Sequence, residues 1–383
     1  MTATPSAAWL PVYAQFPLRA VSGSGSYIVD DQGERWLDAY GGHAVASTGH
    51  CHPAVVRAIT EQAAKLIFYS TAIPHEGREL LAEAIAARCP DPLAKVFFCN
   101  SGAEANENAL GLARKVTGRQ TIVSVEGGWH GRTAATLAVT HGAKYEEIAR
   151  RSGIPLSRKV AFNDVAAISA AVDDTVAAVI VEPVQGMGGA RDCSPDFLRA
   201  ARLACDREGA LLVFDEIQCG VGRCGAFTAA EAFEVVPDVV TLAKGLAAGL
   251  PIGAMVATTA ASATIKVGDL GSTFGGGPVP CAAALAVLQV IDKERLIENA
   301  VMVGDHIRRA VQKLPAVKQV TGRGLLLGLW LDRPAGPVQR TLFESKILTG
   351  TSSDPSVLRL MPPLTFSRSE ANLVIDALRR VLS

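Results

Sequence analysis

Three segments of the sequence place reactive or ligand-binding residues directly after short apolar runs. The segment NSGAE (residues 100–104) follows VFFC, Asp215-Glu216 follows ALLVF, and Lys244 follows DVVTLA. A helix that begins after the first run could bind a phosphate with its free N–H groups. A carboxylate after a buried strand could hold a protonated ring nitrogen, and a lysine in apolar surroundings could form a Schiff base.

Each segment also has a simpler interpretation. Ser101 and Glu104 have the spacing of a helix N-cap with an acidic first turn. Asp215 could make a structural ion pair or cap a helix, and Lys244 could be a solvated loop residue. Taken together, the three segments indicate pyridoxal phosphate, because this cofactor needs a phosphate cradle, a carboxylate for its ring nitrogen and a lysine for its Schiff base.

The elements that must position these residues follow from the pattern of apolar runs. Short runs that do not alternate are separated by helical patterns, which is typical of a mainly parallel sheet with helices on both faces. Such sheets bind ligands beyond the carboxyl ends of their strands, where the three segments lie. Strands are predicted over residues 96–100, 121–127, 176–184, 210–216, 238–245 and 253–259, and helices over 103–118 and 196–209.

The last hundred residues differ in character from the middle of the chain. A helical stretch over 281–313 precedes apolar runs at 325–331 and 357–363 and a closing helix over 368–382. This pattern favours a smaller α+β domain that the N-terminal arm completes. The predicted organisation is an arm over 1–47, a large cofactor-binding domain over 48–280 and a C-terminal small domain over 281–383.

The composition describes a globular protein of enzyme size. The chain has 383 residues, of which 49% are hydrophobic and 19% charged, so it can bury sizeable cores. Lys plus Arg equals Asp plus Glu, 37 against 37, which argues against binding to nucleic acid or to a membrane through a basic surface. The eight cysteines form no CxxC pair and the first residues lack a signal-peptide pattern, so we expect the cytoplasm.

Three other patterns suggest sites that the sequence as a whole does not favour. His50-Cys51-His52 resembles a metal tract, but adjacent residues do not readily converge on one ion, so no metal is expected. Residues 220–225 (GVGRCG) match the glycine spacing of a dinucleotide site, yet DEIQC separates them from the strand and no clear helix follows. Residues 245–265 are uncharged, but Pro251 and several Ser and Thr residues argue against a membrane span.

The ordered motifs of the chain resemble those of a known family. They are CNSGAEANENALGLAR, HGRT, EPVQGMGG, FDEIQCGVGRCG, TLAKG and GSTFGGGP, and the similarity covers nearly the whole chain. The sequence is similar to the class III aminotransferases of the pyridoxal-phosphate fold type I superfamily, closest to the N-acetylornithine and ornithine aminotransferase group. The resemblance implies an α/β fold, with a large domain built on a mainly parallel seven-stranded sheet and a smaller α+β domain.

The resemblance also implies roles around the cofactor ring. Lys244 would form the Schiff base and move the proton, and Asp215 would bind the ring nitrogen, so these two are the expected catalytic residues. Gln218 would reach the phenolic oxygen of the ring. Trp129 occupies the place of the family's usual Phe and would stack on the ring.

At the phosphate, the resemblance implies backbone contacts and a contribution from a second subunit. Gly102 and Ala103 would give N–H groups to the phosphate. Thr273 would reach the phosphate in the neighbouring subunit, which implies an obligate homodimer. The other residues of the expected cofactor-binding set are Ser101, His130, Glu182, Ile217 and Ser272.

Two arginines are expected to select the substrates. Arg132 would bind the carboxylate of the amino donor, and Arg359 would bind the α-carboxylate of glutamate or 2-oxoglutarate. The planar guanidinium suits both roles because it pairs with a carboxylate through two hydrogen bonds. For each arginine the alternative is an ordinary ion pair at the surface or between domains.

The reaction that we expect is a ping-pong transamination. The ω-amino group of N-acetylornithine, or of a similar N-acyl diamino acid, would pass to 2-oxoglutarate and give the semialdehyde and glutamate in arginine or lysine biosynthesis. The alternatives are another class III transaminase, acting on an ω-amino acid, γ-aminobutyrate, ornithine or an amine, and a pyridoxal-phosphate-dependent aminomutase. A catalytically silent binding protein is disfavoured by the presence of Lys244 and Asp215.

The sequence departs from the family pattern at three positions that bear on specificity. Met187 stands where the ornithine and acetylornithine enzymes typically carry a Glu that pairs with the arginine equivalent to Arg359. Our hypothesis is that Arg359 lacks this gate and is available to a carboxylate in both half-reactions, which loosens the discrimination between α- and ω-amines. Gly277 replaces the family's usual Asn, and Trp129 is bulkier than Phe, so both could reshape the entrance.

Overall fold

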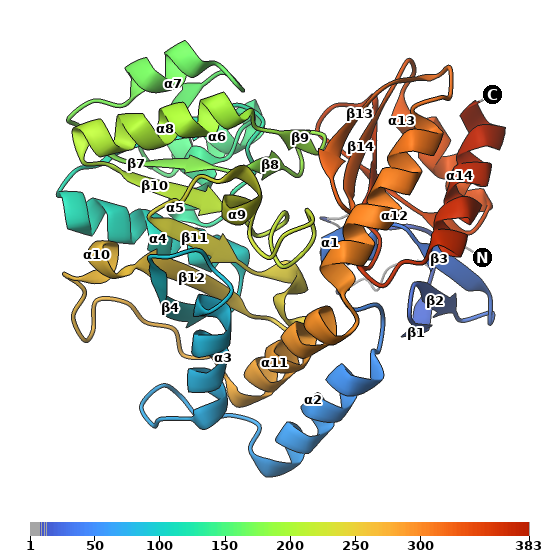
Figure 1. The fold of residues 1–383 in the computed structure, drawn as a ribbon, viewed down its shortest axis with the longest axis horizontal. Coiled ribbons are helices and arrows are strands. Elements are labelled where there is room, and N and C mark those ends of the chain that lie inside the picture. Colours follow the sequence, from blue (N-terminus) through green and yellow to red (C-terminus); the bar gives the residue numbers. More distant parts are fainter. Residues whose placement is uncertain (1–7, 9, 11, 13, 383) are drawn as a thin grey trace.

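The middle of the chain folds into a seven-stranded sheet, which lies on the left in Figure 1. The computed structural model describes residues 8, 10, 12 and 14–382, so part of the predicted N-terminal arm lies outside the described residues. The strand order is β4-β12-β11-β10-β7-β5-β6, and only β12 runs against its neighbours. The strands are β4 (Leu93–Cys99), β5 (Thr121–Val125), β6 (Arg158–Val160), β7 (Val176–Val181), β10 (Leu211–Asp215), β11 (Val239–Leu242) and β12 (Gly253–Thr258).

The prediction of a mainly parallel sheet with two covered faces is confirmed. Every residue of β7, β10, β11 and β12 is buried. Alternate residues of the strands pack with different helices: Ile180 belongs to the cluster that contains residues of α4 (Gly102–Thr117), and Val179 to the cluster that contains residues of α8 (Pro195–Glu208). Of the seven strands, only β6 escaped the sequence prediction, because its three residues carry too short a pattern to be read.

Shorter elements connect the strands of this sheet. They are α5 (Ala134–Val139), α6 (Ala143–Arg151), α7 (Val165–Ala171), β8 (Val184–Gln185), β9 (Arg191–Asp192), α9 (Ala229–Phe233), the 3₁₀ helix η1 (Lys244–Ala247) and α10 (Thr259–Ser262). The loops that follow β4, β5, β10 and β11 leave the sheet at the same edge, because these strands point in one direction. This edge is where the sequence places its candidate residues.

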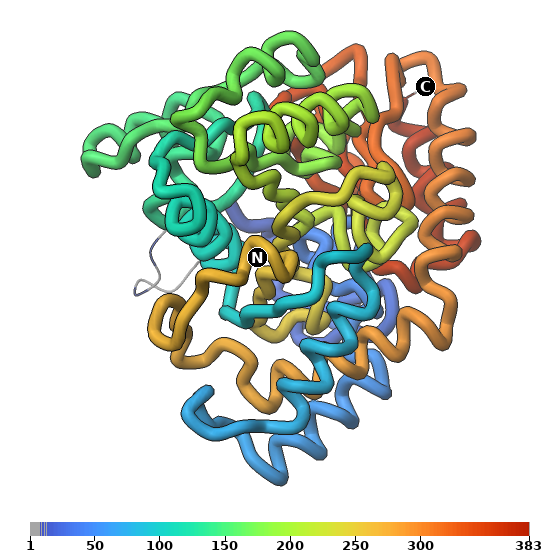
Figure 2. The backbone as a smooth tube through the Cα atoms, turned by 60° about the vertical axis from the view of Figure 1, so that its left-hand side comes forward, coloured from blue at the N-terminus to red at the C-terminus, as the bar shows by residue number. Residues whose placement is uncertain are grey.

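The C-terminal residues form a second, antiparallel sheet with helices, shown in orange and red in Figures 1 and 2. The predicted helix over 281–313 is wrong in one respect, because it is two helices that break at Arg295, where φ is 51°. The sheet order is β13-β14-β17-β16. The elements are α11 (Pro278–Lys293), α12 (Leu296–Val311), β13 (Val317–Arg323), β14 (Leu326–Leu331), α13 (Ala335–Glu344), β16 (Gly350–Thr351), β17 (Val357–Leu360) and α14 (Arg368–Leu382).

The N-terminal strands pair with a strand from the far end of the chain. A third sheet has the order β1-β2-β3-β15, in which β15 (Ile347–Leu348) runs parallel to β3 (Arg35–Asp38). The segment between β3 and β4 then crosses to the large sheet, where α11 packs against α2 and α3. The remaining elements are β1 (Ala20–Ser24), β2 (Tyr27–Asp30), α1 (Gly41–Ala44), α2 (Pro53–Lys65) and α3 (Glu76–Ala86).

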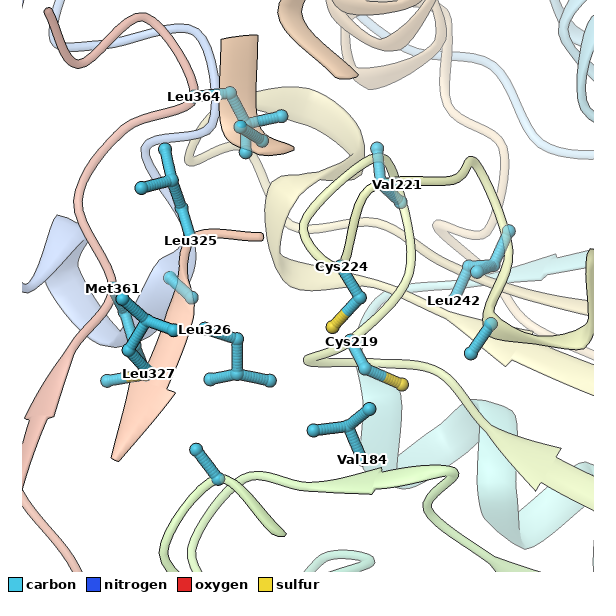
Figure 3. Close-up of a cluster of buried hydrophobic side chains, with 14 of the residues drawn as sticks. Val184, Cys219, Val221, Cys224, Leu242, Leu325, Leu326, Leu327, Met361 and Leu364 are labelled. Carbon is cyan, nitrogen blue, oxygen red and sulfur yellow. The ribbon is translucent and has the colours of Figure 1, made fainter. Parts of the chain in front are cut away.

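One apolar core joins the two main parts of the molecule. Figure 3 shows Cys219, Val221 and Cys224, from the loop after β10, beside Leu325 and Met361 of the C-terminal part. The glycine-rich segment 220–225 belongs to this contact, since Arg223 donates from Nη1 to the carbonyls of Leu325 and Pro362. These residues therefore hold the two parts together, and none of them lines the cavity described next.

Candidate active site

A cavity of about 530 Å³ lies at the carboxyl edge of the large sheet. It is bounded by the residues that follow β4, β5, β10 and β11, as the sequence predicts for a ligand site in such a sheet. Eight of the predicted site residues line it: Ser101, Gly102, Ala103, Trp129, His130, Arg132, Ile217 and Lys244. The other predicted residues surround these eight or lie further away, as described below.

The start of α4 offers unpaired N–H groups to this cavity. The Oγ of Ser101 accepts a hydrogen bond of 3.2 Å from the N of Glu104, which is the predicted N-cap. The N–H groups of Gly102 and Ala103 have no partner among the described residues. A Cβ at Gly102 would lie 2.6 Å from the Cδ1 of Ile217, so only glycine leaves room here. The same segment is thus both a capped helix and an open anion cradle.

The carboxylate of Asp215 ends β10 and is 2% exposed. Its Oδ2 accepts from the Nδ2 of Asn106 at 2.7 Å and from the Nδ1 of His130 at 2.8 Å. Its Oδ1 accepts from the backbone N of Ile217 at 3.1 Å. These partners are an amide, an imidazole and a backbone N–H. Among the described residues, Asp215 pairs with no Lys or Arg, and its one ion-pair contact is with His130.

Asn106 is a site residue that sequence analysis missed. It lies on α4 among Ala105, Ala109 and Leu110, and it is fully buried. A polar residue on the apolar face of a helix needs hydrogen-bond partners, because burial of an unpaired amide costs free energy. That single polar position on the buried face of α4 was the available signal.

Lys244 begins η1 directly after β11, with φ at 46°. Its ammonium makes no hydrogen bond or ion pair with any described residue, although it lines the cavity. Burial lowers the pKa of Lys244, and the charge of Arg359 acts in the same direction, whereas Asp215 and Glu182 oppose the shift. A larger share of this lysine is therefore the neutral, nucleophilic amine.

Glu182 lies beneath the loop that carries Trp129. Its Oε1 accepts from the N of Trp129 at 2.7 Å, and its Oε2 accepts from the N of Gly186 at 2.9 Å. Burial, and then the charge of Asp215, raises the pKa of Glu182 to about 7. The Trp129 ring lines the cavity and packs edge-on against Tyr145, with 5.0 Å between ring centroids. Both oxygens of Glu182 are thus occupied by loops at the site.

Arg359 is a buried cation without a carboxylate partner. It lies on β17 and is 1% exposed. Its Nε donates to the carbonyl of Thr351 at 2.7 Å, and its Nη1 donates to the carbonyl of Gly186 at 3.1 Å and to the Oε1 of Gln218 at 3.3 Å. Its Nη2 lies 3.1 Å from the Sδ of Met187. No described carboxylate forms an ion pair with Arg359. Met187 and Arg359, the two residues that the sequence hypothesis connects, are in contact.

The remaining predicted residues differ in their placement. Arg132 is exposed at the cavity and has no hydrogen bond or ion pair with a described residue. The Oγ of Ser272 accepts from the Nδ2 of Asn100 at 3.1 Å, whereas Thr273 is exposed and lies outside the cavity lining. Gly277 caps α11 with φ at −59°, a conformation that any residue adopts, so its backbone does not require glycine.

The histidine tract of residues 50–52 serves the packing of loops. His50 pairs through Nε2 with the Oδ2 of Asp38 at 2.8 Å, and His52 caps α2 and pairs with Glu294 at 3.0 Å. Among the described residues, no group of three or more His, Cys, Asp or Glu side chains is arranged to hold a metal ion. Residues 245–265 form the end of η1, a loop, β12 and α10, and no helix in the described part of the chain is long and apolar enough to cross a membrane.

The site has the parts that define a pyridoxal-phosphate-dependent enzyme, and comparisons with known proteins identify its family. The sequence model of the family "Aminotransferase class-III" matches residues 11–382. The chain is 42% identical over 389 residues to the acetylornithine aminotransferase of Mycobacterium leprae, covering 100% of this chain and 96% of the relative. It is 39% identical over 380 residues to that of Methanosarcina mazei, covering 97% and 93%.

The fold matches solved structures of the same kind. A structure of the ornithine aminotransferase from Toxoplasma gondii, with partial occupancy of pyridoxal phosphate at its active site, aligns with a TM-score of 0.91 and 31% identity. The alignment covers 97% of this chain and 91% of that one. The chain belongs to the class III aminotransferase family. It is a pyridoxal-phosphate-dependent transaminase, and the predicted fold class, enzyme class and cofactor are confirmed.

The described residues fit this cofactor on their own chemistry. The unpaired N–H groups of Gly102 and Ala103 provide donors for a phosphate, and a Cβ at Gly102 would fill the space beside them. The oxygen Oδ1 of Asp215 has one donor and can accept another from a protonated ring nitrogen. The partnerless ammonium of Lys244 faces the same cavity.

Proposed function

We propose that this transaminase moves the ω-amino group of N-acetylornithine, or of a similar N-acyl diamino acid, to 2-oxoglutarate. The observation that carries the proposal is a pair of arginines that have no carboxylate partner among the described residues, Arg132 at the cavity and Arg359 close to Lys244. Arg359 is buried, and a buried cation without an anion is costly unless a ligand supplies the charge. Arg132 is exposed at the cavity, so the two cations suit two substrates that each carry a carboxylate, and the names of the relatives support the choice of donor.

The proposed roles at the cofactor follow from the contacts of each residue. Gly102 and Ala103 bind the phosphate, with Ser101 fixing the start of their helix. Asp215 binds the ring nitrogen, while His130 and Ile217 donate to its oxygens. The other proposed contacts are Trp129 on the ring face, Gln218 at the phenolic oxygen, and Glu182 and Ser272 through the loops that they hold.

When bound, pyridoxal phosphate supplies a carbon that accepts the donor's amine and a ring that stores the electrons released with the donor's proton. Lys244 would hold the cofactor through its amine and, once the donor displaces it, would take up the donor's proton, because burial lowers the pKa of its ammonium. Asp215 would favour the protonated ring nitrogen by accepting its N–H at Oδ1, which has one donor among the described residues. Arg132 holds the far carboxylate of the donor, and Arg359 holds the α-carboxylate of 2-oxoglutarate.

We also propose that the active enzyme is a homodimer in which Thr273 reaches the phosphate site of the neighbouring subunit. Thr273 lies beside an exposed apolar surface in which the rings of Phe68 and Phe274 are 5.1 Å apart. The other exposed apolar residues nearby on the chain are Leu66, Ile67, Tyr69 and Ile73. Large exposed apolar surfaces of this kind favour association with another protein surface.

A complementation experiment tests this dimer. Mixed dimers of Thr273→Ala and Lys244→Ala subunits contain one site with both residues intact, so they should regain cofactor affinity and activity that neither variant has alone. Mixed dimers without any recovery, or a monomeric holoprotein, would refute the arrangement.

We also propose that the protein is cytoplasmic and that it has two domains joined by an N-terminal arm. All eight cysteines are free, which is typical of a protein in the reducing cytoplasm. We place the large domain at residues 48–280 and the small domain at 281–383, joined by the arm over 1–47. The pairing of β15 with β3 supports the connection between the arm and the small domain.

A visible absorption spectrum of the purified holoprotein tests the donor. The band of the lysine-bound cofactor should disappear when N-acetylornithine is added without a keto acid, and it should return when 2-oxoglutarate follows. A band that responds to glutamate but not to N-acetylornithine would refute the donor and leave the transaminase. A protein that never takes up pyridoxal phosphate would refute the proposed site.

A second candidate function is favoured by one observation. The Sδ of Met187, and no described carboxylate, contacts the Nη2 of Arg359, so Arg359 would be available to a substrate carboxylate in both half-reactions. A broader transaminase that also accepts ornithine, γ-aminobutyrate or another ω-amine would have this arrangement. Comparison of the same spectral change across these donors distinguishes the two candidates.

A further inference from the structure

Asn106 occupies the centre of a buried hydrogen-bond chain beneath the cavity. Asp215 of β10 and Thr241 of β11 lie opposite each other in register on adjacent parallel strands. Their side chains therefore point to the same face of the sheet, which α4 covers. Asn106 projects from α4 between them, and it is fully buried.

The amide of Asn106 is fixed in one orientation by its neighbours. Its Nδ2 donates to the Oδ2 of Asp215 at 2.7 Å and to the backbone carbonyl of His130 at 2.8 Å. Both partners are acceptors only, so the opposite orientation would bring oxygen against oxygen. The hydroxyl of Thr241 then donates to the amide Oδ1 at 2.7 Å. Two side chains and one backbone carbonyl thus hold the amide hydrogens toward the carboxylate.

This orientation has a chemical consequence for Asp215. A hydrogen bond to a carboxylate is short and strong, so it fixes the orientation of the group. With Oδ2 held by Asn106 and His130, Oδ1 is left to accept a hydrogen bond from the ring nitrogen. The amide also prevents the carboxylate from rotating away from the cavity.

We propose that Asn106, oriented by Thr241, is a positioning residue that holds the carboxylate of Asp215 aimed at the ring nitrogen of the cofactor. This inference rests on the role proposed above for Asp215. It assigns to α4 a function at the ring in addition to its N-terminal cradle for the phosphate, and Asn106 itself does not line the cavity.

The test compares Asn106→Ala, Thr241→Val and Thr241→Ser with the wild-type protein. The dissociation constant for pyridoxal phosphate is measured by titration, and the protonation of the ring nitrogen is measured by nitrogen-15 NMR with labelled cofactor. Asn106→Ala should weaken binding by roughly tenfold to a hundredfold, because it removes a hydrogen bond to a charged group. Its nitrogen signal should move toward that of the unprotonated ring.

Thr241→Val should give the same spectral change with a smaller loss of affinity, roughly threefold to tenfold, because it removes only the donor that orients the amide. Thr241→Ser keeps the hydroxyl, so its affinity for pyridoxal phosphate and its nitrogen signal should equal those of the wild type. The matched control is Thr117→Val, which removes a hydroxyl that donates at 2.8 Å to the carbonyl of Ala113 in the same helix. This control should bind the cofactor as the wild type does.

Asp215→Ala separates failure of this inference from failure of the role on which it rests. If Asp215→Ala changes affinity and nitrogen signal but Asn106→Ala and Thr241→Val do not, the inference is wrong, even if the apoprotein melts at a lower temperature. If Asp215→Ala also changes neither readout, the proposed role of Asp215 is wrong. Should Asn106→Ala not fold, the difference between Thr241→Val and Thr241→Ser decides the question.

Discussion

Substitution of Met187 by Glu should place a carboxylate beside Arg359 and slow only one of the two half-reactions. The Nη2 of Arg359 lies 3.1 Å from the Sδ of Met187, so a carboxylate of similar reach would accept a charged hydrogen bond there. Among the described residues, Arg359 donates only to neutral groups, namely two carbonyls, an amide and a thioether. A substrate carboxylate would then have to displace the introduced carboxylate, and only the substrate that uses Arg359 would be affected.

The size of the effect follows from the hydrogen bond that must be broken. A hydrogen bond between charged partners contributes about 1.5–3 kcal/mol after solvation is included. With RT near 0.6 kcal/mol, this corresponds to a loss of roughly tenfold to 150-fold in apparent affinity. The desolvation of the new carboxylate reduces the gain of its pairing, so the lower half of this range is the expected result.

The assay measures each half-reaction separately by stopped-flow absorbance. For Met187→Glu, kcat/KM with glutamate should fall by the stated factor, whereas kcat/KM with N-acetylornithine should remain within about threefold of the wild-type value. Met187→Gln is the matched control, since it has the same length without the charge. An equal fall with both substrates, or no change with either, would refute the view that Met187 leaves Arg359 without a gate.

Three further predictions concern the phosphate cradle, the donor arginine and pH. Gly102→Ala should weaken pyridoxal phosphate binding at least about tenfold, because its Cβ would lie 2.6 Å from Ile217, and cofactor titration measures this loss. The control is Gly111→Ala in the same helix, whose Cβ meets no atom within 4 Å. Thermal melting should show that this control stabilises the fold by about 0.5–1 kcal/mol. Arg132→Gln should raise KM for N-acetylornithine at least about tenfold and leave the glutamate half-reaction unchanged; equal effects in both half-reactions would contradict the assignment. Burial raises the pKa of Glu216 from 4.5 to about 8, so the folded state retains a proton that the unfolded chain loses, and apoprotein stability should fall as pH rises through that interval. Melting curves of Glu216→Gln should show a smaller fall, and an unchanged slope would count against this cause.

Much of the large domain and of the site could be predicted because its signals are local. Each apolar run of the sheet is read from four to seven consecutive residues, and the chemistry follows at the next position, as with Asp215 and Lys244. The parallel sheet then brings these strand ends to one edge without further information. Two features were not predicted, also for local reasons. Strand β6 has only three residues, and the break between α11 and α12 at Arg295 does not interrupt the apolar pattern of the sequence.

What the sequence by itself determined was the class of site: a phosphate cradle, a carboxylate, a reactive lysine and the motifs of the family around them. The tertiary structure decided how these residues are held, because packing brings together groups that are far apart in the chain. Asn106 meets Asp215 across 109 positions, and Met187 meets Arg359 across 172. No local pattern encodes such distances, since they depend on strand order, on the helix that covers each face and on the docking of the C-terminal part. The tertiary fold therefore decides that Arg359 is buried beside Met187 and not beside a described carboxylate.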